Sequence, residues 1–230
     1  GESVDESKLK VSNAPTNGYV LSAQSGNTGG LTWAAVSTGA TSLGDLSDAT
    51  TTATSNIGLG ANAVDSITTG DWNVGVGDNA LTATTSGERN VGVGFNALLL
   101  NTTGVRNSAV GMDSLGANTS GDYNTALGNN SLGANTTGSQ NTAVGYNSLL
   151  SNTTGLNNTA IGRLTLDANT TANNNTAVGA SALGQNTTGT ANSAFGSGAL
   201  TSNTTADYNT SVGYNALYAN TTGTKSTAVG

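Results

Sequence analysis

The chain has 230 residues, of which 8% are charged and 4% are aromatic, and its formal net charge is −7. It contains 33 glycines but neither cysteine nor histidine, which excludes disulfides, thiolate chemistry, and the commonest general base and metal ligand. Large apolar side chains are too scarce to fill the wide core of an ordinary globule. With only six Lys and Arg and no apolar run near the ~18 residues of a membrane span, we expect neither nucleic-acid binding nor membrane insertion.

Residues 1–36 are expected to form a small β-rich cap or joint. Short strands are predicted over residues 8–12, 19–24 and 31–36, because the segments between them carry turn signals such as Pro, Asn-Gly and Gly-Gly. Trp33 is the expected packing anchor. Residues 37–55 are rich in Ser, Thr, Gly and Asp, and they are predicted to be a linker.

From Asn56 onward the sequence repeats every 17 residues without insertion or deletion. Ten complete units and five residues of an eleventh reach Gly230. Positions are numbered 1 to 17 from the Asn that opens each unit. The unit at 141–157 reads Asn-Thr-Ala-Val-Gly-Tyr-Asn-Ser-Leu-Leu-Ser-Asn-Thr-Thr-Gly-Leu-Asn. Such a unit is too short for two helices, and its Gly, Asn and Thr are poor helix formers. The sequence therefore predicts an all-β solenoid over residues 56–230, with one coil per unit.

Each coil is predicted to hold two short strands, at positions 2–5 and about 8–11. The turns fall at positions 5–7 and 12–15, with a positive φ expected for the Gly at position 15. Positions 4 and 9 are the expected core, represented by Val76, Leu81, Val93, Leu98, Val110, Leu115, Val144, Leu149, Val178, Leu183, Val212 and Leu217. Position 1 is expected to form an axial ladder of stacked amides, made of Asn73, Asn90, Asn107, Asn124, Asn141, Asn158, Asn175, Asn192 and Asn209.

This core is thin for a free-standing coil. Burying one Val and one Leu contributes ~3–6 kcal/mol per coil. Ordering the backbone costs ~1–2 kcal/mol for each residue of the coil. Coil-to-coil hydrogen bonds offset part of the difference, and contact with other chains is expected to supply more. We therefore expect a parallel homotrimer.

Two resemblances follow from the repeat. The segment Asn-Thr-Ala-Val-Gly, as at 141–145 and 175–179, resembles the head repeats of trimeric autotransporter adhesins, which are β-rolls that trimerise and bind host surfaces. The longer segment 209–223 resembles repeats of bacteriophage tail-fibre proteins, as do residues 8–23 and 30–33. The adhesin repeat is usually shorter than 17 residues, so the resemblance implies the architecture more firmly than the shape of the coil.

Several features invite a ligand-binding interpretation. The Thr pair at positions 13 and 14 suggests ice binding, but adjacent strand residues face opposite ways and a turn is favoured. The Asn-Thr-Thr segments match the glycosylation pattern as a by-product of the repeat. The acids Asp65, Asp71, Asp78, Asp113 and Asp167 fall at several repeat positions, whereas a calcium β-roll places Asp at a fixed phase. Neither a metal nor a cofactor is expected.

The variable positions 6, 10, 16 and 17 offer a display surface if they face solvent. Aromatic residues there suit glycan or protein contacts, with decoration of turns and trimer seams as the equal alternative. The candidate contacts are Tyr123, Tyr146, Tyr208, Tyr214 and Tyr218.

The sequence predicts a non-enzymatic structural or adhesive protein. The leading hypothesis is the shaft of a phage tail fibre in the virion, which spaces or presents the end that binds the host receptor. Its partners would be two further copies of itself, other fibre or baseplate proteins, and a host-surface glycan or protein. The alternatives are the head of a trimeric adhesin on a bacterial surface, and an ice-binding solenoid.

Overall fold

The computed structural model describes residues 19–23, 31–35, 49–50 and 55–230, and the chain divides into two units, Gly1–Asp45 and Leu46–Gly230. In the first unit, β1 (Tyr19–Ala23) pairs antiparallel with β2 (Leu31–Ala35). This hairpin confirms two of the strands expected there. The strand expected at 8–12 and the packing of Trp33 lie outside what is described.

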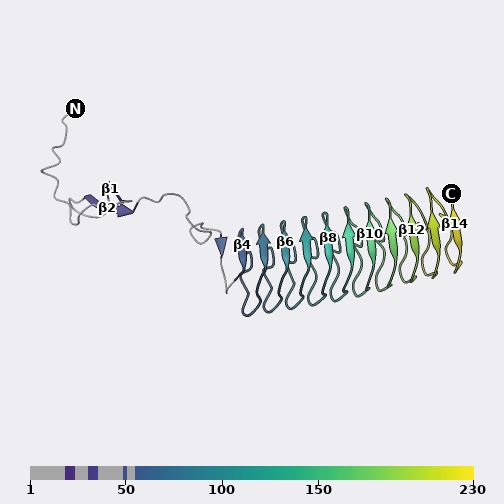
Figure 1. Cartoon of the computed structure of the whole chain (residues 1–230), viewed down its shortest axis with the longest axis horizontal. Helices are drawn as coiled ribbons and strands as arrows, with labels where there is room; N and C mark the ends of the chain where they lie inside the picture. The colour runs from purple at the N-terminus through teal and green to yellow at the C-terminus, as the bar shows by residue number, and fades with distance from the viewer. Residues whose placement is uncertain (1–18, 24–30, 36–48, 51–54) are drawn as a thin grey trace, which may run out of the picture. The chain divides into compact units, whose positions relative to one another are not determined.

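The second unit is a parallel β-solenoid with one strand in each coil (Figure 1). Residue i of each strand pairs with residue i + 17 of the next, as Thr142 does with Thr159. The short β3 (Ala49–Thr50), which lies in the segment expected to be a linker, pairs antiparallel with β4 at the start of the solenoid. The strands are β4 (Ile57–Leu59), β5 (Val74–Val76), β6 (Val91–Val93), β7 (Ser108–Val110), β8 (Thr125–Leu127), β9 (Thr142–Val144), β10 (Thr159–Ile161), β11 (Thr176–Val178), β12 (Ser193–Phe195), β13 (Thr210–Val212) and β14 (Thr227–Val229). The prediction of an all-β solenoid with 17-residue coils is confirmed.

The second strand predicted in each coil is wrong. Positions 8–11 form consecutive turns, because the residues at positions 7 and 9 adopt left-handed backbone, with φ of 54° at Asn147 and 52° at Leu149. Hydrogen bonding from coil to coil continues through these turns. The Leu149 N–H, for example, donates to the Thr165 carbonyl over 3.0 Å.

Glycine occurs at positions 5 and 15 of the repeat for different structural reasons. Gly145, at position 5, has φ of 129°, and a Cβ there would lie 2.5 Å from the Gly162 carbonyl oxygen of the next coil. The positive φ expected at position 15 is not found in the described coils, where Ala172 and Ala206 also occupy this position. A Cβ on Gly155 would lie 2.3 Å from Asn152 Oδ1, so glycine relieves a close approach there, but the alanines show that the position also accepts a methyl group.

The core of the coil is formed by positions 3 and 9, with the alanines of position 8 such as Ala97, Ala182 and Ala199. The predicted core leucines Leu81, Leu98, Leu115, Leu149 and Leu183 are fully buried, and Leu217 near the open end packs partly buried against them. Position 3, mostly Ala, is buried with them, as at Ala143 and Ala160. Strand residues alternate between faces, so position 4 must point outward. The prediction that position 4 belongs to the core of the coil is therefore wrong for Val76, Val93, Val110, Val144, Val178 and Val212, all of which are partly exposed.

Two ladders of buried asparagines run along the solenoid. In the predicted ladder at position 1, each Oδ1 accepts the backbone N–H of the next Asn, as Asn124 does from Asn141 over 3.0 Å. The Asn141 Nδ2 also donates to the Gly155 carbonyl over 2.8 Å. Position 12 forms a second ladder, which sequence reasoning missed by treating this Asn only as a turn residue. There Asn152 Nδ2 donates to Asn135 Oδ1 over 2.8 Å.

Candidate interaction surfaces

An apolar strip runs along the outer face of the sheet, and we call it the ridge. It consists of the position-4 side chains of β4 to β14, and Val110, Ile161 and Phe195 are each about two-fifths exposed (39–42%). Position 2 lies on the same face and carries only Ile, Val, Ser or Thr, so neither column has a charged residue in any coil. A continuous exposed apolar strip of this kind is typical of an interaction surface. The ridge consists of Leu59, Val76, Val93, Val110, Leu127, Val144, Ile161, Val178, Phe195, Val212 and Val229.

The Thr-rich segment at positions 13–15 is a turn, as the sequence predicted. The first Thr of each pair turns its hydroxyl onto the backbone of the next coil, and Thr136 Oγ1 donates to the Thr153 carbonyl over 3.1 Å. The Asn before this pair is buried, as Asn135 illustrates with no exposed surface. A buried side chain of this kind is not accessible for glycosylation.

The predicted contact tyrosines are exposed but do not gather into one patch. Tyr146 and Tyr214 share position 6 but lie four coils apart, and Tyr123 and Tyr208 share position 17 at a separation of five coils. Tyr218 lies in the same coil as Tyr214. They therefore do not form a column along the solenoid, although three of the five fall in its last two complete coils.

Position 17 also carries Arg89 and Arg106, in the second and third coils. The Arg89 guanidinium lies 4.3 Å from the centre of the Trp72 ring and 2.7 Å from a carboxylate oxygen of Glu88. Arg106 stacks at 5.2 Å on Tyr123 and donates to its hydroxyl. Each guanidinium is therefore engaged by its neighbours in the coil stack.

The acidic residues do not converge. Among residues 55–230, no group of three or more Asp, Glu, His or Cys is arranged to hold a metal ion. Burial raises the pKa of the Asp167 carboxyl above its usual value, and its own backbone hydrogen bond partly opposes this. In the described part of the chain, no helix is long and apolar enough to span a bilayer.

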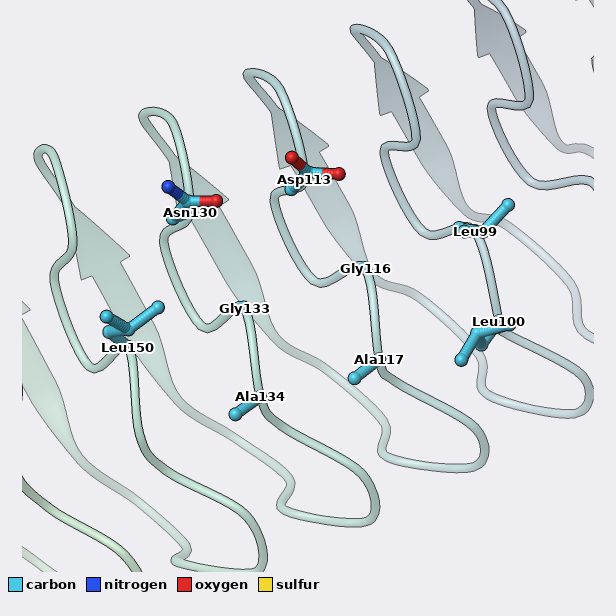
Figure 2. A pocket seen from close by; sticks show the side chains of 9 residues that line it. All are labelled: Leu99, Leu100, Asp113, Gly116, Ala117, Asn130, Gly133, Ala134 and Leu150. Carbon is cyan, nitrogen blue, oxygen red and sulfur yellow. The ribbon is translucent and has the colours of Figure 1, made fainter.

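A notch of about 370 Å³ interrupts the turn face of coils 3 to 6, counted from Asn56 (Figure 2). Its floor is made by Gly116, Ala117, Gly133 and Ala134. Leu99 and Leu100 close one end, Leu150 closes the other, and Asp113 and Asn130 lie along one edge. The lining is thus apolar with a carboxylate and an amide on a single side.

Comparison with protein-family models, with curated proteins and with solved structures finds no match to this chain.

Proposed function

We propose that this chain is a segment of a trimeric structural fibre, namely the shaft of a phage tail fibre that spaces or presents host-receptor binding. The ridge carries the proposal, because an uncharged apolar strip the length of the solenoid suits permanent contact with identical chains. The similarity of residues 209–223 to tail-fibre repeats favours the phage setting over the bacterial surface.

The geometry of the ridge suits parallel copies in register. An apolar residue recurs at position 4 of every coil, at a spacing of ~4.8 Å. In parallel chains at the same height, each of these residues would therefore contact the same residue of the other two chains. The ridge is one strand wide, and three such narrow faces can enclose a common axis. Covering a half-exposed Val or Ile contributes roughly 1 kcal/mol per coil and chain. Each of the eleven strands from β4 to β14 adds this contribution, which supplements the burial within the thin coil.

The oligomeric state tests this proposal. A chain of 22.5 kDa is expected to give three times that mass in light scattering. The double variant Ile161→Glu with Val178→Glu places charges on the ridge in neighbouring strands and is expected to abolish the trimer. The matched control, Tyr146→Glu with Ala180→Glu, changes exposed position-6 residues and should leave the mass unchanged. A monomeric parent chain contradicts the proposal.

Cross-linking provides a second test of the trimer that does not depend on whether the charged variant folds. The chain lacks cysteine, so a single Thr159→Cys beside the ridge is expected to form a disulfide with the same residue of a second chain. A Tyr146→Cys variant should not, because position 6 lies beyond the strand, in the turn that follows it.

The assignment to a phage tail fibre, as opposed to a bacterial surface, is tested separately by immunogold labelling with antibody against the purified solenoid. Labelled tail fibres on virions from the source culture support the shaft. Labelling of bacterial surfaces in place of virions supports the adhesin alternative and overturns the phage assignment.

A further inference from the structure

The notch arises where the repeat departs from its own pattern. Position 10 carries a side chain in seven of the ten coils, among them Leu99 and Leu150, and it is Gly at 116, 133 and 184. Only Gly116 and Gly133 are consecutive, so two adjacent coils lack the side chains that fill this column elsewhere. The leucines on either side then stand as walls.

A second departure from the repeat lies at the edge of the notch, where position 7 is Asp113 and not the Asn of the preceding coils. Asn79 Nδ2 donates to Asn96 Oδ1 over 3.1 Å, and Asn96 Nδ2 donates to Asp113 Oδ1 over 3.0 Å. An ionised carboxylate has no proton to pass on, so this chain of side-chain hydrogen bonds ends at Asp113. No described residue hydrogen-bonds the side-chain amide of Asn130, although its backbone N–H donates to the Met112 carbonyl. This side chain lies beside Asp113 on the notch edge (Figure 2).

The geometry points to a binding site for a neutral six-membered sugar ring, a pyranoside. The CH-bearing face of the ring would lie on the glycines and alanines between the leucine walls. A ring hydroxyl would donate to the second Asp113 oxygen, and another would accept from Asn130 Nδ2. Asp113 and the net charge of −7 disfavour an anionic sugar.

This assignment rests on the proposed function in one respect, which is avidity. The volume of the notch lies at the small end of the range for ligand sites, ~300–1,000 Å³. A single open notch should bind with a dissociation constant on the order of millimolar. Three parallel copies would present three notches at one height, which strengthens attachment to a repeating glycan.

Titration of the full chain with the methyl pyranosides of glucose, galactose and mannose tests the site. We expect at least one of them to shift the methyl resonances of Leu99 and Leu150 and the side-chain amide of Asn130 in a saturable manner. Gly133→Leu restores a side chain found in the neighbouring coils and should weaken binding at least tenfold. Asp113→Asn keeps the shape of the notch and should weaken it about fivefold, since a hydrogen bond to a charged acceptor is the stronger.

Gly184→Leu is the matched control. At Gly133 and at Gly184 alike, an added Cβ meets a backbone carbonyl oxygen and the end of a neighbouring side chain at 3.2–3.3 Å, so the two variants carry similar strain. Gly184→Leu should bind the sugar as the parent chain does. The assignment is overturned if none of the three sugars binds, if both glycine variants lose binding equally, or if cyclohexanol binds as well as the sugars. Trimer mass is measured in parallel, so a monomer that still binds sugar would refute the fibre and leave the site standing.

Discussion

Left-handed backbone at fixed positions decides which residues each coil tolerates. Asn147 at position 7 suits this conformation because its short polar side chain reduces the steric cost. Leu149 at position 9 has φ of 52°, where a non-glycine residue costs roughly 1–2 kcal/mol. Full burial of its side chain offsets that cost. The sequence signals the first of these conformations, but nothing in the residue type signals the second.

Gly145→Ala is expected to destabilise the solenoid by about 3 kcal/mol. The methyl group would meet the Gly162 carbonyl at 2.5 Å, in a backbone conformation that L-residues rarely adopt. Chemical denaturation monitored by circular dichroism measures the change. Gly116→Ala is the control, since φ there is not positive and the nearest atom to its Cβ is 3.3 Å away. Equal loss in the two variants would show that conformation and contact at position 5 are not limiting.

At the scale of the element, the alternation of inward and outward side chains defines the strand. The two ladders of asparagine side chains hold the turns of successive coils together. The 17-residue period was sufficient to predict one coil per unit, the buried leucines and the position-1 ladder. It was not sufficient to place position 4, because apolar character at every unit fits a buried column and an outward-facing column equally well. The alternation of the short strand decides between them, with Ala143 inward and Val144 outward.

The position-12 ladder gives a prediction at this scale. Within the described coils, replacing Asn135 by Ala removes the only hydrogen-bond donor to the buried Asn118 Oδ1, whereas the Gly138 carbonyl still accepts from Asn124. Leaving one buried acceptor without a partner costs about 1–3 kcal/mol. The loss should appear in the free energy of unfolding.

Asn101→Ala is the internal comparison, because Asn101 begins this ladder and, among residues 55–230, its Nδ2 donates only to the Gly104 carbonyl. That carbonyl keeps its bond from Asn90, and Asn118 Nδ2 keeps its bond to Gly121. Removing Asn101 therefore orphans no acceptor, and the variant should be less destabilised than Asn135→Ala. An equal effect at both sites would mean that lost volume, and not the broken ladder, governs the cost.

At the scale of the whole solenoid, each coil contacts its neighbours along the stack, so stability should follow the number of coils and the continuity of their register. The notch could not be predicted from the sequence, because it depends on how neighbouring coils stack. Gly116 and Gly133 read as ordinary turn residues singly, and only stacking reveals that two absent side chains lie side by side.

Deleting residues 141–157, one whole unit, is expected to preserve the fold. Asn158 would then follow Asn124 in the position-1 ladder, and Ile161 would follow Leu127 on the ridge. The solenoid should shorten by ~4.8 Å in small-angle scattering and unfold with slightly less cooperativity.

Deleting Leu150 alone shifts every later residue by one position, which turns the ridge inward in all subsequent strands. That variant should lose the coils beyond the deletion, seen as rapid amide hydrogen exchange confined to residues after 150. Retention of slow exchange there would show that the stack tolerates a register slip, and that the strict period has another cause.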